Sequence, residues 1–107
     1  MTDKPSRLEV FKKMAVARPG DPFVWYALAM EHRSLGDLPT SLRAFEDVRD
    51  RFPDYVATYL MAGQVAGELA QFDVAREWLT AGARVAEKMG DSHAHGELMS
   101  ALGSLPA

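Results

Sequence analysis

The segment with the clearest potential for chemistry is Asp91-Ser92-His93-Ala94-His95-Gly96-Glu97. His93 and Glu97 are four positions apart, so on a helix they share a face and could bind a metal ion. His95 is two positions from His93 and points to another side of the same helix. A structural zinc site needs four ligands, and the sequence offers no second ligand cluster. We interpret the segment as polar residues that open a helix, and metal binding through His93, His95 and Glu97 stays an alternative.

Other catalytic patterns are missing from the sequence. It has no Gly-rich phosphate loop, no nucleophile elbow and no paired carboxylates between apolar walls. The absence of cysteine removes thiolate catalysis, disulfides and cysteine-ligated zinc. His32 is interpreted as a packed residue rather than an acid or base. We therefore predict that the protein is not an enzyme and needs no cofactor.

Charge and hydropathy narrow the class of partner. The formal net charge of −3 argues against nucleic acid, because affinity for phosphate backbones rests on clustered Lys and Arg. No apolar run is long enough to cross a bilayer, and the N-terminus does not resemble a signal peptide. We predict a cytoplasmic protein with no membrane partner. A chain of 107 residues is expected to form one domain.

The elements that position these residues are organised around the stretch from Pro22 to Pro53. Its first half has apolar residues at helical spacing, a break follows at Gly36-Asp37, and a second apolar stripe follows the break. The stripes contain Val24, Trp25, Leu28 and Ala29, and then Leu42, Phe45 and Val48. This pattern predicts a helical hairpin, which cannot bury its apolar surface without a neighbouring hairpin.

A shift of the sequence by 34 positions aligns a second copy of the hairpin. At most of the seven compared positions, aromatic residues meet aromatic ones and small residues meet small ones. The pairs are Trp25 with Tyr59, Leu28 with Ala62, Ala29 with Gly63, Leu38 with Phe72, Ser41 with Ala75, Phe45 with Leu79 and Val48 with Gly82. The reverse shift places Leu42, Phe45, Val48 and Pro53 on Leu8, Phe11, Met14 and Pro19. The N-terminal helix is therefore interpreted as the second half of a repeat.

Length and spacing resemble the tetratricopeptide repeat, with its pattern W-x2-L-G-x2-Y, then A-x3-F, then P. The first unit reads Trp25, Leu28, Ala29, His32, Ser41, Phe45 and Pro53; the second reads Tyr59, Ala62, Gly63, Ala66, Ala75 and Leu79. His32 and Ala66 depart from the tyrosine of the pattern, and Glu87 stands in place of the second proline. The resemblance covers roughly Leu8 to Glu87.

The resemblance implies an all-α, right-handed α-solenoid fragment of antiparallel helical hairpins with a C-terminal capping helix. We predict a single domain over 1–107, divided into a half-repeat helix (6–19), repeat 1 (22–53), repeat 2 (56–89) and a capping helix (92–105). Ser6, Asp21 and Asp54 are predicted helix caps. Gly63 and Gly67 are expected where neighbouring backbones approach closely. The tail is not interpreted as a third repeat, because Glu97 falls on Gly63.

In this family the first helix of each hairpin lines the concave side, where a peptide or protein segment binds. The resemblance therefore implies a non-enzymatic adaptor. The groove positions that it indicates are Phe23, Tyr26, Met30, Arg33, Ala57, Leu60, Met61, Gln64 and Glu68. The carboxylate clamp of some members needs basic and amide residues where this chain has Tyr26, Met30 and Leu60, so an apolar or amphipathic ligand is favoured. Alternatively, the tail helix covers Tyr26 and Met30.

The half-repeat also bears on self-association. The helix that carries Leu8, Val10, Phe11 and Met14 lacks the first helix of its own hairpin, so part of its apolar surface faces water unless a second chain covers it. The aliphatic stems of Lys12 and its neighbours could instead cover that surface. A monomer and a two-fold homodimer are both left open, and a homo-oligomeric scaffolding module is an alternative function.

Overall fold

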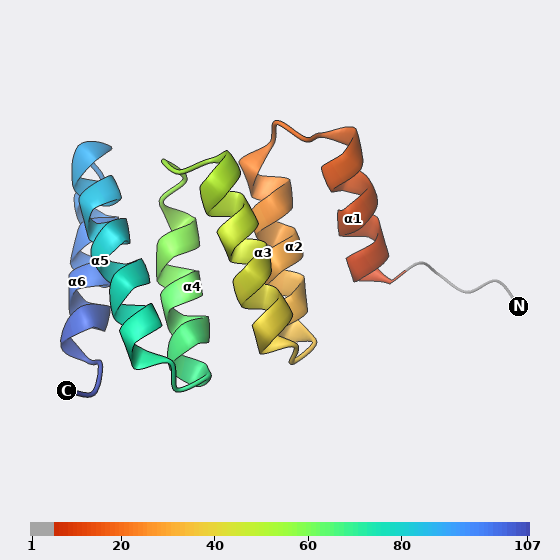
Figure 1. The fold of residues 1–107 in the computed structure, drawn as a ribbon. Coiled ribbons are helices and arrows are strands. Elements are labelled where there is room, and N and C mark those ends of the chain that lie inside the picture. Colours follow the sequence, from red (N-terminus) through yellow and green to blue (C-terminus); the bar gives the residue numbers. More distant parts are fainter. Residues whose placement is uncertain (1–5) are drawn as a thin grey trace, which may run out of the picture.

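The chain forms a stack of antiparallel helices (Figure 1). The computed structural model describes residues 6–107, which contain α-helices and no strand. The helices are α1 (Arg7–Ala17), α2 (Pro22–Ser34), α3 (Leu38–Arg51), α4 (Ala57–Glu68), α5 (Phe72–Lys88) and α6 (Ser92–Gly103). The predicted all-α fold class is confirmed for this range. Residues 1–5 of the predicted domain lie outside the described part.

Most helices begin where a side chain caps them. Ser6 Oγ accepts a hydrogen bond from the Glu9 N–H at 3.1 Å, and Asp21 Oδ1 accepts one from the Phe23 N–H at 3.0 Å. Asp37 and Asp91 cap α3 and α6 in the same way. These side-chain oxygens accept hydrogen bonds from amide groups that a helix leaves free in its first turn. The predicted caps Ser6 and Asp21 are confirmed.

The predicted cap at Asp54 is wrong. Helix α4 begins at Ala57, and Val56 before it provides no side-chain cap. The Asp54 carboxylate instead accepts two hydrogen bonds from Lys88 Nζ, both at 3.1 Å. Because Lys88 is the last residue of α5, this ion pair joins the two ends of one hairpin, and the carboxylate turns away from the helix that it was expected to cap.

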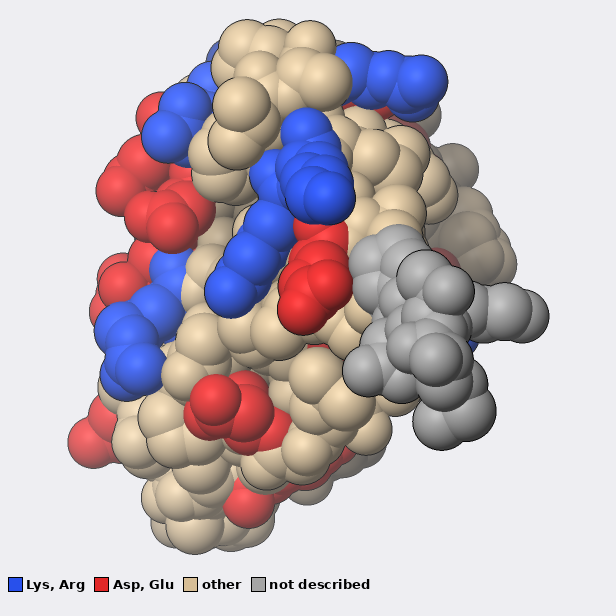
Figure 2. Space-filling model, turned by 90° about the vertical axis from the view of Figure 1, so that its right-hand side faces the viewer, with Lys and Arg blue, Asp and Glu red and all other residues tan. Residues whose placement is uncertain are grey.

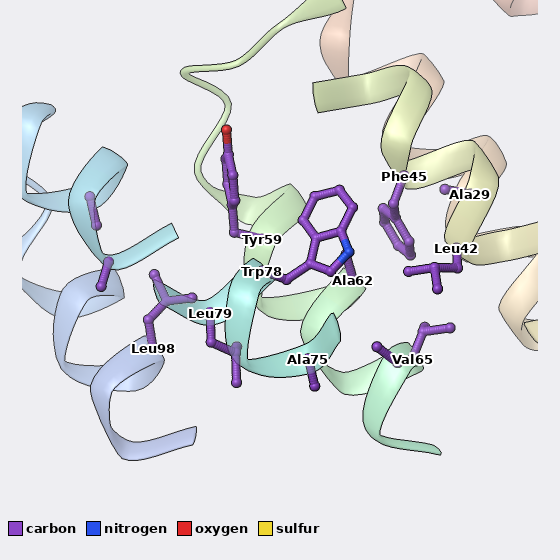
Figure 3. Packing of buried hydrophobic residues seen from close by; sticks show 13 residues of the cluster. Ala29, Leu42, Phe45, Tyr59, Ala62, Val65, Ala75, Trp78, Leu79 and Leu98 are labelled. Atoms are coloured by element: carbon purple, nitrogen blue, oxygen red, sulfur yellow. The ribbon is translucent and has the colours of Figure 1, made fainter. Parts of the chain in front are cut away.

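A continuous apolar core runs from α2 to α6 (Figure 3). Ala29 and Phe45 come from the first hairpin, and Tyr59 and Trp78 come from the second. The rings of Tyr59 and Trp78 meet edge-on with centroids 5.9 Å apart. Leu98 of α6 is buried against α5 and closes the core at the C-terminal end. Each hairpin thus buries its apolar surface against the next.

Two glycines allow the helices of the second hairpin to approach closely. A Cβ at Gly63 would lie 2.5 Å from Leu79 Cδ2, and a Cβ at Gly82 would overlap Tyr59 Cβ. The close approach predicted at Gly63 is therefore confirmed. The same prediction for Gly67 is wrong, because no atom lies within 4 Å of a Cβ built there.

Trp25 is less deeply buried than its place in the repeat pattern predicts. Its ring is half-buried, while Val24 beside it is fully buried. The Trp25 indole N–H donates to the Pro19 carbonyl at 3.1 Å, and the Arg51 guanidinium lies 4.0 Å from the ring centroid. The indole therefore ties the α1–α2 loop to the end of α3, which holds it at the edge of the core.

Candidate functional site

A groove lined by α1, α2, α4 and α6 consists of three connected depressions. The first, which we call the α1–α2 well, has a volume of about 350 Å³. The second, the central well, has about 340 Å³, and the third, the α4–α6 well, has about 600 Å³. Tyr26 lines the first two wells, and Leu60 lines the second and the third. These shared walls make the three wells one surface, which we call the groove.

The α1–α2 well has an apolar floor with one ion pair at its edge. Its apolar wall contains Phe11, Phe23 and Met30. Phe23 is 59% exposed, which is high for a phenylalanine. Arg7 Nε lies 3.3 Å from Glu31 Oε2, and the Glu31 side chain is largely buried at this contact. The ion pair compensates for the burial of the carboxylate and leaves the apolar floor open.

The central well is bordered by three helices and by the residues just before two of them. Residues of α2, α4 and α6 surround it: Tyr26, Val56, Ala57, Leu60, Met61, Asp91, His93, Ala94, Glu97 and Leu98. Its walls are mainly apolar, and its polar groups come from the N-terminal part of α6 and the loop before it. A depression of this size with a few polar groups at its rim is typical of a binding site.

Tyr26 forms the partition between the first two wells. Its ring packs against Phe45 with centroids 5.9 Å apart and against Tyr55 with centroids 5.7 Å apart. Burial raises the pKa of the Tyr26 hydroxyl above its ordinary value, and Tyr55 raises it further while Arg33 lowers it. The hydroxyl therefore stays neutral at physiological pH and can donate a hydrogen bond. The two aromatic contacts hold the ring in a fixed position between the wells.

Arg33 gathers three further residues at the other end of α2 and α4. Its guanidinium forms an ion pair with Glu68 and lies 3.4 Å from Gln64 Oε1 and 3.5 Å from Met61 Sδ. We call these four residues the Arg33 cluster. The cluster neutralises the arginine and links α2 to α4 across the groove.

Seven of the nine groove residues indicated by the sequence line the wells, and the other two, Arg33 and Glu68, lie beside them in the Arg33 cluster. Phe23 and Met30 line the α1–α2 well, and Tyr26 lines it and the central well. Ala57, Leu60 and Met61 line the central well, and Leu60 and Gln64 line the α4–α6 well. Arg33 and Glu68 belong to the Arg33 cluster with Met61 and Gln64. Their part in binding stays a proposal.

The residues of α6 that line the groove were not indicated by the sequence, which raised α6 only as a cover for Tyr26 and Met30. His93, Glu97 and Ala94 line the central well, and Tyr26 remains only half-buried beside them. The tail helix therefore borders the groove and leaves a space open. A shift of 33 positions would have found these residues, since it places Gly96 on Gly63, Glu97 on Gln64 and Leu98 on Val65.

His93 and Glu97 lie close enough together to offer two metal ligands, but His95 does not join them. His93 Nε2 lies 3.0 Å from Glu97 Oε1. His95 lies on another side of α6, where it borders a separate depression with Ala86 and Glu87. Within residues 6–107, no three His, Cys, Asp or Glu side chains are close enough together to hold a metal ion.

The chain resembles solved structures of tetratricopeptide repeat domain proteins. A crystal structure of a tetratricopeptide repeat domain protein from Salinibacter ruber matches with a TM-score of 0.71 and 35% sequence identity, over 77% of this chain and 91% of that one. A solution NMR structure of a tetratricopeptide repeat domain protein from the same organism matches with a TM-score of 0.74 and 36% identity, over 78% and 85%. The chain belongs to the tetratricopeptide repeat family. No protein-family model and no curated protein matched the sequence.

Membership of the tetratricopeptide repeat family confirms the predicted fold and indicates a general role in protein–protein interaction. Helical repeat proteins of this kind present extended surfaces that bind other proteins, and they generally serve as scaffolds rather than as enzymes. In the described part of the chain, no helix is both long enough and apolar enough to cross a membrane. The function of a tetratricopeptide protein depends on the surface that it offers to a partner, which in this chain includes the groove.

Proposed function

We propose that this tetratricopeptide protein is a non-enzymatic adaptor that binds a segment of a partner protein in the groove. The observation that carries the proposal is the pair of apolar wells on either side of Tyr26. Two wells with one common wall accept two neighbouring apolar side chains of the same segment. Burial of each large apolar side chain contributes about 1.5–3 kcal/mol, and the surplus over the cost of ordering the segment gives its affinity.

The chemistry of the walls supports a segment with apolar anchors. Met30 and Met61 are flexible and polarisable, so they adjust to side chains of different shapes. Tyr26 offers a ring face for packing and a hydroxyl for a backbone hydrogen bond. An amphipathic helix laid in a groove uses such wells through anchors three or four residues apart.

The proposal is tested with a phage-displayed library of random dodecapeptides selected against the 107-residue chain. Enriched peptides are then synthesised and titrated against Met30→Ala and Leu60→Ala, which each remove one wall without breaking a hydrogen bond. We expect each variant to weaken binding by about five- to thirty-fold, as for loss of about 1–2 kcal/mol of apolar contact. Leu35→Ala is the matched control, because Leu35 is 61% exposed and lines none of the wells.

Circular dichroism of each variant separates loss of the site from loss of the fold. Peptides that bind the wild type and the Leu35→Ala variant equally, and both groove variants more weakly, support the proposal. A selection that yields no peptide sensitive to Met30→Ala or Leu60→Ala contradicts it.

A further inference from the structure

We infer that the groove selects a basic amphipathic segment, with apolar side chains in the wells and a Lys or Arg beside Glu97 and Asp91. This inference rests on the binding function proposed above and adds the charge of the partner to it. The arginines along the groove are already paired with carboxylates of the chain, whereas the carboxylates at the central well have no Lys or Arg partner among the described residues.

The permanent positive charges along the groove are neutralised by the chain itself. Arg7 pairs with Glu31 at 3.3 Å, and Arg33 pairs with Glu68 and approaches Gln64. Among the described residues, Arg7 is the only Lys or Arg that lines the three wells, and Arg33 lies beside them. An acidic segment would therefore have to break one of these pairs to gain a partner, and the carboxylate released would repel it.

Two carboxylates at the central well have no Lys or Arg partner within the described residues. Glu97 contacts only His93 among the ionisable groups, with 3.0 Å between Oε1 and Nε2, and no described Lys or Arg lies within ion-pair distance of it. Asp91 Oδ1 accepts the Ala94 N–H at 3.0 Å and caps α6. The helix dipole offsets only about half a charge at that end. The rim of the central well is therefore negative.

The negative rim borders apolar walls, and this combination defines the ligand. A Lys or Arg side chain can place its aliphatic stem against Leu60 and Ala94 while its charge reaches Glu97. The net charge of −3 acts in the same direction, because it attracts basic segments and slows the approach of acidic ones. A peptide that offers only a carboxylate has no unpaired cation to meet in the groove.

The charge preference is tested on the peptides that bind the groove in the library selection. We expect them to be enriched in Lys or Arg next to aliphatic or aromatic residues and to carry net positive charge. Glu97→Gln should weaken them by about two- to five-fold, the range for a partly exposed ion pair, and Glu97→Lys should weaken them more. Glu46→Gln, an exposed carboxylate on α3 outside the wells, is the matched control and should leave the affinity unchanged.

Salt supplies an independent readout. Raising the salt concentration from about 0.05 to about 0.5 M should weaken the wild-type complex more than the Glu97→Gln complex. Salt screens the charge of Glu97 in the wild type, and the variant has no charge at this position. Groove-dependent peptides that are neutral or acidic, or that bind Glu97→Lys as well as the wild type, would overturn the charge inference and leave the adaptor function standing. A library without groove-dependent binders would overturn both.

Discussion

Among the described residues, the buried polar side chains are Glu31, Ser41 and Thr58. Glu31 meets Arg7, and Ser41 Oγ donates to the Ala29 carbonyl at 2.8 Å, which joins α3 to α2. Thr58 is fully buried, and its Oγ1 makes no hydrogen bond to any described residue. A buried hydroxyl without a partner loses its hydration and gains nothing in return.

Thr58→Val should therefore stabilise the protein. Valine keeps the shape of threonine and replaces the hydroxyl by a methyl group, so the free energy of unfolding should rise by about 1 kcal/mol, with a higher melting temperature in thermal unfolding. Thr80→Val on α5, where the side chain is only half-buried, is the control and should change stability by less than about 0.5 kcal/mol. A less stable Thr58→Val variant would show that the hydroxyl has a partner in solution.

At the scale of the elements, each hairpin depends on how closely its two helices approach. In the second hairpin a Cβ built on Gly82 of α5 would clash with the Tyr59 Cβ of α4 and would also lie 2.9 Å from Leu98 Cδ2 of α6. Three helices therefore meet at a position that leaves no room for a side chain. Gly67 of α4 is also helical, but a methyl group there would meet open space.

Gly82→Ala should destabilise the protein, because the new Cβ would clash with the Cβ of Tyr59. Each of these atoms is bonded directly to the backbone, so neither can rotate away. Overpacking of this kind costs about 1–3 kcal/mol. Gly67→Ala is the matched comparison and should gain about 0.5–1 kcal/mol, since alanine is the better helix former. Urea denaturation of the two variants beside the wild type gives both values, and a neutral Gly82→Ala would mean that α4 and α5 lie further apart than the structure shows.

For the molecule as a whole, the α1 end of the stack carries charged side chains of both signs among uncharged residues (Figure 2). Lys and Arg side chains lie among the other residues on this face, and Asp and Glu side chains lie both along its left edge and nearer its middle, beside the Lys and Arg. Val10 is 39% exposed and Val16 is 83% exposed, both on α1. Phe23 of the neighbouring α2 is 59% exposed, so several large apolar side chains face water at this end.

We predict weak two-fold self-association through this end, because a second copy would cover Val10 and Phe23 together. Light scattering behind a sizing column should show a mass that rises above the 11.8 kDa of one chain as the loading increases. Val10→Glu should abolish the rise by burying an unpaired charge at the contact, while Leu35→Glu should preserve it. A mass that stays at 11.8 kDa up to high micromolar loading excludes the dimer.

The helices themselves were predictable, because their signals lie between residues close together in the chain. Ser6 and Asp21 cap the amides of the next turn, and Gly36 takes a positive φ of +80° that ends α2. The period of 34 positions and the apolar stripes then set the order of the hairpins and the buried positions Phe45 and Leu79. Helical spacing also indicated which residues of α2 and α4 lie along the groove.

The tertiary structure alone decided how the helices are turned and which side chains meet across them. Glu31 pairs with Arg7 of another helix, and Met61, Gln64 and Glu68 of α4 gather around Arg33 of α2. Asp54 in the loop before α4 pairs with Lys88 at the end of α5. Such contacts depend on the packing of the whole stack, which residue types and local spacing do not contain.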